Sequence, residues 1–345
     1  MTKSLENIQK ILVMNLAFIG DVVLSTPVTR VLREAYPQAV MDMLVVPVTA
    51  EIASGNPFVN EVLVYDKRGQ HKKLGQLLKL IWEIRSRHYD LAVCTNFAAR
   101  GAMLAWIAGI PYRAGYDRQH ANLFLTHIAS GERSEICHEA ENYLAVLKPL
   151  GITTADTTLT FQVQEQDKLN LAAKVPKLTL DQPIAVVCPS GSYPRKSWTI
   201  SAYAELICRL AEESQVVLIG GGREAAELSK ISQASADLAG KNVASVLAGE
   251  LSLGELAALL QRCKVLVSID TGPMHIAQAV GTPVVALFGP TDPAIWGPRG
   301  LDDHVFYEKL SCSPCWGKGD CTKNRCMTDI AAEKVIEAAL RQIRK

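Results

Sequence analysis

The stretch Ser268–Pro293, SIDTGPMHIAQAVGTPVVALFGPTDP, decides the fold of this chain. Together with the residues just before it, this stretch has four parts in order. They are an apolar run (Lys264–Ile269), a turn (Asp270–Pro273), a short helical pattern (Met274–Val280) and a second apolar run (Pro283–Phe288). This order predicts one βαβ unit. The two strands of such a unit are parallel, so their carboxyl ends lie at the same edge of a sheet.

The turn of this unit predicts an anion site. Thr271 or Asp270 is suited to cap the helix, and Pro273 suits its first turn, where a missing N–H group costs nothing. A helix N-terminus with free N–H groups attracts phosphate. The polar loop after the second strand, Gly289–Pro293, is expected at the same edge. The expected ligand contacts are Asp270, Thr271, Gly272, Pro273, His275, Gly289 and Thr291.

A third polar loop, Pro189–Trp198, follows a predicted strand over Ile184–Val187. Its glycine and hydroxyl residues supply hydrogen-bond donors, and two cations stand beside them. This composition suits a diphosphate. The expected contacts here are Ser190, Gly191, Ser192, Arg195 and Lys196. The alternative is a surface loop in which Trp198 begins the packing of the next helix.

Three motifs carry a family resemblance: LAFIGDVVLSTPVTRVLREAYP from Leu16, CPSGSYPRKSW from Cys188 and DTGPMHIAQAVGTPVVALFGPTDP from Asp270. Together they resemble the ninth glycosyltransferase family, the bacterial ADP-heptose:lipopolysaccharide heptosyltransferases, over nearly the whole chain. Within that family the tail CSPCWGKGDCTKNRCM, from Cys312, is more similar to the second heptosyltransferase of inner-core assembly than to the first. The resemblance implies the glycosyltransferase-B fold, with two Rossmann-like domains whose parallel sheets face a cleft.

The resemblance also implies an activity: inverting, metal-independent transfer of heptose from ADP-heptose to the inner core of a lipopolysaccharide precursor, with no cofactor required. Asp21 matches the aspartate of the family's IGDVV motif, which implies a general base. Lys196 matches a phosphate contact, which implies that it meets the charge of the leaving diphosphate. Without the family, Asp21 is equally well explained as a carboxylate at a helix start.

The periodicity predicts α/β architecture in two domains. In the first half, strands are expected at Lys10–Asn15, 41–46, 61–65 and 91–96, with helical patterns between them. The second half repeats this alternation, with further strands at 216–219 and 243–246. A weakly patterned, Thr-rich segment sets the boundary, which gives an acceptor-binding domain over 1–155 and an ADP-sugar-binding domain over 156–345. The sequence leaves open which domain the C-terminal helix packs on.

Positive charge is concentrated between Lys67 and Arg133, where eleven Lys or Arg face four Asp or Glu. Three arginines at expected element ends are candidates for binding an anionic acceptor: Arg100, Arg113 and Arg118. Five other basic residues have helical spacing and are expected on a solvated helix face: Lys72, Lys73, Lys79, Arg85 and Arg87.

Composition narrows the class of protein. The chain has 345 residues, 48% of them hydrophobic, and a net charge of +1, which gives no electrostatic case for nucleic-acid binding. The longest apolar run, Ala102–Ile110, is about half of what a bilayer span needs. The N-terminus is polar and then turns directly into a strand, unlike a signal peptide. We therefore expect a cytoplasmic protein. The family resemblance implies an acceptor at the membrane surface and a peripheral location at the inner face of the inner membrane.

Four cysteines near the C-terminus, Cys312, Cys315, Cys321 and Cys326, have spacings that partly resemble a zinc knuckle. Three alternatives stay open for them: a structural zinc site, reduced thiols, or disulfides.

The run Gly220–Ala225, GGGREA, keeps an NAD-dependent dehydrogenase in view as an alternative function. That enzyme, however, places the motif after the first strand of its domain, whereas here it follows the second. A non-catalytic protein that binds a nucleotide sugar is the other alternative.

Overall fold

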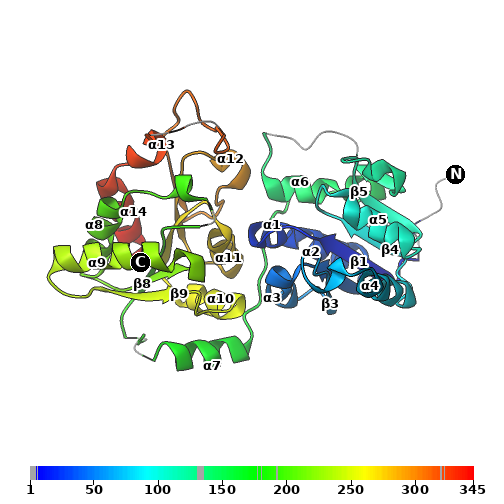
Figure 1. Cartoon of the computed structure of the whole chain (residues 1–345), viewed down its shortest axis with the longest axis horizontal. Coiled ribbons are helices and arrows are strands. Elements are labelled where there is room, and N and C mark those ends of the chain that lie inside the picture. The colour runs from blue at the N-terminus through cyan, green and yellow to red at the C-terminus, as the bar shows by residue number, and fades with distance from the viewer. Residues whose placement is uncertain are drawn as a thin grey trace. The chain divides into compact units, whose positions relative to one another are not determined.

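The computed structural model describes residues 5, 7–129, 136–176, 178–179, 181–191, 193–318, 321 and 323–345. The chain forms two compact units, Met1–Gln162 and Val163–Lys345, and each contains a six-stranded parallel sheet (Figure 1). Among the described residues, no helix combines the length and the apolar character that crossing a bilayer requires.

The sheet of the first unit has the order β3-β2-β1-β4-β5-β6. Its strands are β1 (Lys10–Asn15), β2 (Val40–Val45), β3 (Glu61–Val64), β4 (Leu91–Cys94), β5 (Tyr112–Tyr116) and β6 (His127–Ala129). Its helices are α1 (Ile19–Leu24), α2 (Thr26–Ala35), α3 (Ala50–Ser54), α4 (Leu74–Ser86), α5 (Ala99–Ile107) and α6 (Glu139–Ala145). The central strands are apolar and buried because helices cover both faces of a parallel sheet.

The sheet of the second unit has the order β12-β11-β10-β7-β8-β9. Its strands are β7 (Ile184–Cys188), β8 (Gln215–Gly220), β9 (Ala244–Ala248), β10 (Val265–Ile269), β11 (Val284–Phe288) and β12 (His304–Tyr307). Its helices are α7 (Glu165–Lys174), α8 (Ile200–Leu210), α9 (Ala225–Ala239), α10 (Leu253–Arg262), α11 (Gly272–Val280), α12 (Pro293–Trp296), α13 (Arg325–Thr328) and α14 (Ala332–Ile343).

Both sheets have the same doubly wound topology. In each, the first and the fourth strand of the unit are neighbours: β1 pairs with β4, and β7 pairs with β10. The direction in which strands are added reverses at these pairs, so the loops after the two strands diverge and leave room for a ligand. The fold therefore offers one such switch point in each unit.

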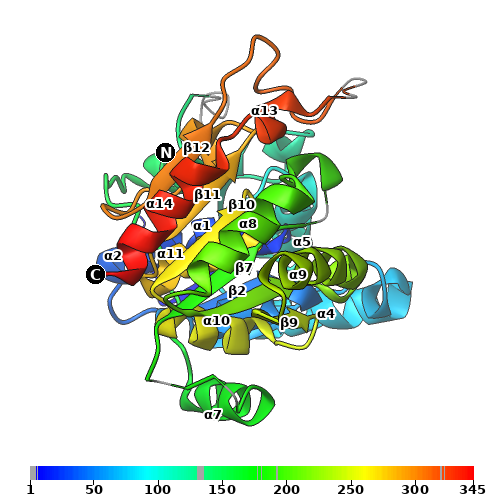
Figure 2. The same cartoon turned by 90° about the vertical axis from the view of Figure 1, so that its left-hand side faces the viewer.

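The C-terminal helix packs on the second unit, which answers the question that the sequence left open. Helix α14 contacts α8, β10 and β11, and Ile336 and Ala339 lie in the same core as the residues of those elements. Figure 2 shows α14 and α8 side by side across the strands.

The predicted strands are confirmed, but the structure differs at three places. The segment after β1 forms two helices instead of one, because Pro27 lacks an N–H group and the chain breaks at Ser25. Strands β5, β6 and β12 were not predicted, since each is short and carries polar residues. Helix α11 begins at Gly272, and Thr271, one of the two predicted caps, occupies its N-cap position but makes no side-chain cap bond.

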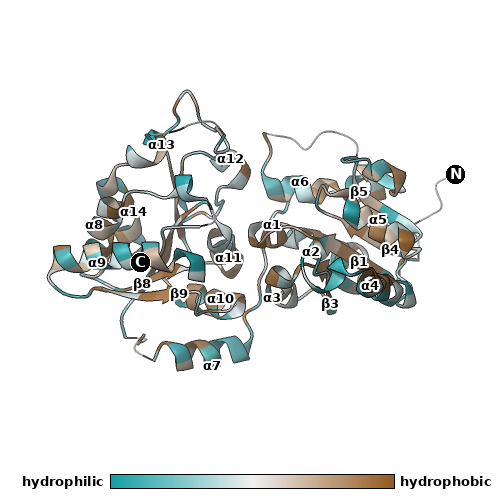
Figure 3. Cartoon of the chain, viewed as in Figure 1, coloured by the Kyte–Doolittle hydropathy of each residue, from teal (hydrophilic) through white to brown (hydrophobic). Residues whose placement is uncertain are grey.

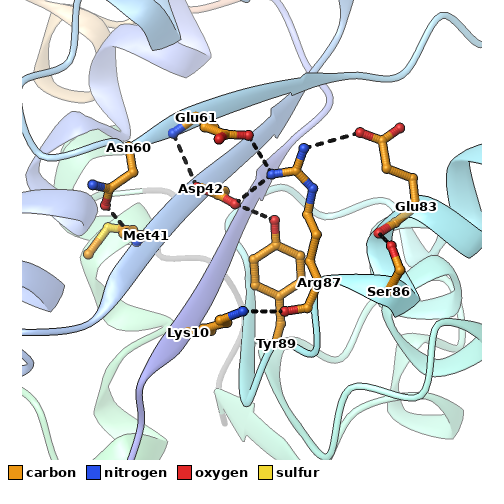
Figure 4. A network of polar contacts seen from close by, with 9 residues as sticks. All are labelled: Lys10, Met41, Asp42, Asn60, Glu61, Glu83, Ser86, Arg87 and Tyr89. Atoms are coloured by element: carbon orange, nitrogen blue, oxygen red, sulfur yellow. Dashed lines mark hydrogen bonds and ion pairs between the residues drawn. The ribbon is translucent and has the colours of Figure 1, made fainter.

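Arg87 does not lie on a solvated helix face, contrary to the expectation. It follows α4 and points inward, where its guanidinium lies 3.1 Å from Asp42 Oδ2, 2.6 Å from Glu61 Oε2 and 3.2 Å from Glu83 Oε1 (Figure 4). Tyr89 donates its hydroxyl to the same Asp42 oxygen at 2.6 Å. Burial raises the pKa of Tyr89, which keeps it a donor. The carboxylate of Asp42, only 3% exposed, is thus held by two donors from one segment.

We expect Arg87→Met to lower the free energy of unfolding by about 1–3 kcal/mol, because it leaves the buried Asp42 carboxylate with fewer donors. Arg85→Met, two residues earlier on the exposed face of α4, is the matched control and should change it by less than about 0.5 kcal/mol. Urea unfolding of both variants tests this. Equal midpoints for the two would mean that the network contributes nothing to stability.

Candidate functional site

An ion pair joins the two loops at the switch point of the second sheet. Lys196 lies in a short 3₁₀ turn after β7, and Asp270 directly follows β10. Lys196 Nζ lies 2.6 Å from Asp270 Oδ2 and 3.1 Å from the main-chain oxygen of Asp270. The side chains of Lys196 and Asp270 are 22% and 8% exposed, so the carboxylate is nearly covered and the lysine keeps part of its surface open to solvent. The structure therefore brings together the predicted cation and the predicted turn.

Close packing of the two loops explains why one of them contains Gly191. A Cβ atom at this position would lie 3.1 Å from Thr271 Oγ1, tighter than ordinary contact. Ser190, just before it, is 2% exposed, and its hydroxyl has no hydrogen-bond partner among the described residues. Ser192 lies outside the described residues. The loop after β7 thus holds an unsatisfied hydroxyl next to the loop that contains Asp270 and Thr271.

The loop after β11 adds a second such hydroxyl. Thr291 is 8% exposed, and in the described part of the chain its Oγ1 also has no partner. Gly289 is packed against α13, because a Cβ atom there would lie 2.5 Å from Met327 Sδ. Leaving a buried hydroxyl unsatisfied costs about 1–3 kcal/mol. A polar ligand bound at this sheet edge would therefore satisfy the hydroxyls that lack a partner.

Helix α11 starts between these loops, at Gly272 and Pro273, so its first N–H groups lie at the same edge. His275, in its first turn, is buried, and its Nδ1 lies 3.1 Å from Gln278 Oε1. Arg195 donates to the main-chain oxygen of Gly317 at 3.2 Å, so this guanidinium also holds the cysteine-bearing segment in place.

Asp21 lies at the corresponding place in the first unit, in the first turn of α1 after β1. Tyr143 of α6 donates its hydroxyl to Asp21 Oδ1 at 2.6 Å, and the N–H group of Phe18 donates to Oδ2 at 3.2 Å. Asn15, at the end of β1, donates to the main-chain oxygen of Asp21 at 3.1 Å. The carboxylate is therefore oriented by two donors and is still partly exposed.

Two of these residues were missed by the sequence reasoning. Tyr143 is 122 residues away from Asp21, and no pattern in the sequence connects them. Asn15 gave a signal that was overlooked: it is the polar last residue of an otherwise apolar, buried strand, directly before the Asp21 motif.

The three arginines proposed for the acceptor are not equivalent. Arg100 follows β4 and donates to Tyr65 Oη at 3.2 Å, and Arg118 follows β5 with its guanidinium 5.3 Å from the centre of the Phe97 ring. Both lie at the carboxyl edge of the sheet. Arg113 lies at the start of β5, where its guanidinium donates to the main-chain oxygens of Ile110, Pro111 and Phe124. These bonds give Arg113 a structural role at the opposite edge.

A cavity of about 310 Å³ opens at the same carboxyl edge of the first sheet. The loops after β1, β2 and β3 line it, and its walls include Phe18, Pro47 and Tyr65, with Lys67 and Arg68 also among its lining residues. Phe18 is 77% exposed and lies three residues before Asp21. The cavity therefore combines an apolar wall with two cations and one acid, Asp66, next to the helix that carries the Asp21 carboxylate.

Comparison with known proteins identifies the family. Residues 77–325 match the model of glycosyltransferase family 9 (heptosyltransferase). The chain belongs to this family. Lipopolysaccharide heptosyltransferase 2 of Escherichia coli K12 is 28% identical over 95% of this chain and 97% of its own. The crystal structure of a family 9 glycosyltransferase from Veillonella parvula is 26% identical, covers 99% of both chains and has a TM-score of 0.88. The structure of E. coli ADP-heptose lps heptosyltransferase II is 26% identical over 97% of this chain and 99% of its own, with a TM-score of 0.81.

Membership of glycosyltransferase family 9 makes the chain a glycosyltransferase with the glycosyltransferase-B fold, so the dehydrogenase alternative is wrong. The GGGREA run has a structural reason instead. The main chain at Gly249 approaches it so closely that a Cβ atom at Gly249 would lie 2.6 Å from the nitrogen of Gly222. Gly249 also donates its N–H group to Gly220 O at 2.8 Å. Glycine on both sides permits this contact.

The structure bears on the three alternatives that the sequence left open for the four cysteines. All nine thiols of the chain are free, which excludes disulfides in this structure, and among the described residues no three His, Cys, Asp or Glu side chains converge as metal ligands. The cysteines also differ in environment: Cys312 and Cys321 are exposed, whereas Cys326 is buried. Burial raises the pKa of the Cys326 thiol.

The unsatisfied hydroxyls predict an unusual response to mutation. Ser190→Ala and Thr291→Val should leave the free energy of unfolding unchanged within about 0.5 kcal/mol, or raise it, because each removes a buried group that has no partner. Thr282→Val is the matched control. The hydroxyl of Thr282 is also buried but donates to Leu260 O at 2.6 Å, so its loss should cost about 1–2 kcal/mol. A clear loss of stability in Ser190→Ala and Thr291→Val, measured by thermal unfolding, would show that the two hydroxyls are satisfied within the protein.

Proposed function

We propose that the protein is an inverting, metal-independent heptosyltransferase that moves a heptose from ADP-heptose to the inner core of a lipopolysaccharide precursor. The observation that carries this proposal is the Lys196–Asp270 pair at the switch point of the second sheet, with two unsatisfied hydroxyls in the flanking loops. The E. coli relative of the same fold is named for ADP-heptose and for lipopolysaccharide, which supports this choice of donor and acceptor.

In this proposal the second unit binds the donor. The ADP diphosphate takes the N–H groups at the start of α11 and the hydroxyls of Ser190 and Thr291, which are the donors that a phosphate needs. Lys196 is held beside them by Asp270 before the substrate binds, so no side chain has to be reorganised when charge develops. His275, Gly272 and Gly289 complete the loops around it, and Arg195 adds positive charge.

The first unit binds the acceptor and supplies the base. The acceptor oxygen forms a bond to C1 of the heptose while the bond from C1 to the diphosphate oxygen breaks, and ADP leaves from the opposite face of the sugar. The proton of the acceptor hydroxyl passes to the carboxylate of Asp21. The bonds from Tyr143 and Phe18 fix the orientation of that carboxylate and leave lone pairs free on both oxygens.

In this proposal no metal ion is needed, because groups of the protein neutralise the negative charge that develops on the leaving diphosphate. The donor half contains no Asp-x-Asp sequence, a common metal-binding arrangement for a sugar diphosphate. Lys196, the amides of α11 and the two hydroxyls supply the neutralising groups instead. The acceptor is anionic, and Arg100 and Arg118 lie where they would attract it, whereas we assign Arg113 to the fold. The proposed location is the cytoplasmic side of the inner membrane.

The experiment that decides the proposal offers the enzyme a panel of ADP and UDP sugars together with a truncated lipopolysaccharide acceptor. Mass spectrometry then detects glycosylated lipid. Transfer from ADP-heptose alone, in buffer containing a chelator, is the expected result. Preference for a UDP sugar, or loss of transfer with the chelator, would contradict the proposed donor or the metal-independent mechanism.

Lys196→Ala should raise the activation free energy of the transfer by about 2–4 kcal/mol and thereby lower kcat. It should weaken ADP binding less, because the cation acts most when charge develops on the departing phosphate. Lys174→Ala is a matched control, since Lys174 also lies 2.6 Å from a buried carboxylate, that of Glu255, in the same unit. Lys174→Ala should change the free energy of unfolding and leave kcat unchanged. Steady-state kinetics with ADP calorimetry separate the two effects. If kcat/KM of Lys196→Ala stays within a few-fold of wild type, Lys196 does not contact the leaving group.

Asp21→Asn should lower kcat at least about a hundredfold, because the amide cannot accept the hydroxyl proton. Its donor affinity should stay unchanged and its melting temperature should fall only slightly, since the amide oxygen still accepts the Tyr143 bond and only the Phe18 capping bond is lost. Asp167→Asn is the control: Asp167 has the same position in α7, where it accepts the N-cap N–H group of Gln164 at 3.2 Å. It should lose the same capping and keep full activity. A variant at Asp21 that melts lower yet turns over normally would show that this carboxylate only caps its helix.

A further inference from the structure

Helix α4 carries an exposed apolar stripe that the proposed chemistry does not use. Leu74, Leu78 and Trp82 follow one another at intervals of four residues, so they lie on one face of the helix, and they are 70%, 53% and 71% exposed. The adjoining face of α4 is the packed one, where Leu80 and Ile84 lie in the core of the first unit. The apolar surface of the helix is therefore wider than the part that the core covers.

A neighbouring helix carries a further exposed apolar side chain. Helix α5 contributes to the same core as α4, so both cover one face of the sheet, and the two helices are in contact. Trp106 of α5 is 52% exposed and packs on Phe124 at 5.5 Å between ring centres. Figure 3 shows apolar residues on both helices. Clustered, exposed large apolar side chains mark an interaction surface more often than a chance feature.

The charges around the stripe are mainly positive. From Lys67 to Arg85 the sequence contains six Lys or Arg and a single acid, Glu83. That acid is paired with Arg87, which leaves its charge compensated. The cations are exposed: Lys67, Arg68, Lys72, Lys73, Lys79 and Arg85. An apolar stripe of Leu and Trp bordered by Lys and Arg is the composition of helices that lie in the interface of an anionic bilayer.

We propose that this face of α4 docks the enzyme on an anionic lipid surface, with Leu74, Leu78 and Trp82 inserted among the acyl chains and the surrounding lysines on the headgroups. Charge decides against a second copy of this chain as the occupant. A two-fold contact through the same face would bring its cations against each other, whereas anionic headgroups neutralise them. The docking needs no step of the proposed transfer reaction.

The position of the surface fits this role. Lys67 and Arg68, at its beginning, also line the cavity beside Phe18 at the carboxyl edge of the sheet. The segment from the end of β3 to α4 thus runs from the cavity to the docking face. A lipid-linked acceptor held in the bilayer would then meet the enzyme near this cavity.

Vesicle co-sedimentation of the full chain tests the proposal, with no nucleotide sugar or glycolipid present. The probes are phosphatidylcholine vesicles alone and vesicles with about one third phosphatidylglycerol. Wild type should bind the anionic vesicles at least about tenfold more tightly, and added salt should weaken the binding. Equal binding to both compositions, or binding to neither, would overturn the proposal.

Two sets of variants locate the contact. The triple change Leu74→Ser, Leu78→Ser and Trp82→Ser should weaken vesicle binding at least about tenfold. Its control is Leu169→Ser with Leu238→Ser, which removes leucines of 64% and 62% exposure from the other unit. The triple change Lys72→Gln, Lys73→Gln and Lys79→Gln should weaken binding about a hundredfold, since each cation contributes about fivefold. Its control changes three exposed lysines of the second unit, Lys230, Lys241 and Lys334, to Gln.

Three further measurements complete the test. Brominated lipid should quench the fluorescence of wild type more than that of Trp82→Phe, and equal quenching would show that Trp82 does not enter the bilayer. The α4 variants should keep the melting temperature and the transfer rate to a water-soluble acceptor, because the changed side chains are exposed and take no part in the reaction. A change from dimer to monomer by light scattering in the serine variant would instead identify a second copy as the occupant.

Discussion

All strands of a parallel sheet end at one edge, and this constraint places every group that we assign to the reaction. Asp21 follows the first strand of its unit, and Lys196 and Asp270 follow the first and the fourth strand of theirs. Lys196 and Asp270 are 74 residues apart in sequence, yet their side chains meet at 2.6 Å because the strands before them are hydrogen-bonded neighbours. Register and strand order, rather than local sequence, therefore set this distance.

The Lys196–Asp270 pair is also informative as an electrostatic arrangement. Withdrawing two charges from water costs more free energy than an ordinary attraction returns, so such a pair is weak evidence for a purely stabilising role. Asp270 is nearly covered, but Lys196 keeps part of its surface open. Because the covered Asp270 carboxylate already holds Lys196 in place, the exposed part of the lysine is pre-organised to bind a second anion. The unsatisfied hydroxyls of Ser190 and Thr291 point to the same interpretation, because a packed loop would have paired or replaced them.

The sequence predicted what depends on local pattern and missed what depends on long-range packing. Runs such as Val284–Phe288 are apolar at every position, so the central strands could be located, and the loops after them could be named as the ligand edge. Nothing local shows that Tyr143 reaches Asp21 or that Arg87 turns inward to Asp42, since each contact joins segments far apart in sequence. The four cysteines illustrate the converse: a spacing that resembles a metal site says little until the side chains are seen to converge.

The two units share one topology and differ in the chemistry at its edge. At the first, a carboxylate is held by the Tyr143 hydroxyl and the Phe18 amide, which leaves it able to accept a proton; at the second, a lysine and unsatisfied hydroxyls are disposed to receive negative charge. Proton acceptance and anion stabilisation are the two demands of an inverting transfer, and they are incompatible at one place, because a cation beside the base would lower its affinity for the proton. Distributing them over two similar sheets lets each edge be tuned separately. The exposed stripe of α4 in the first unit follows from a different requirement, contact with the surface that carries the acceptor.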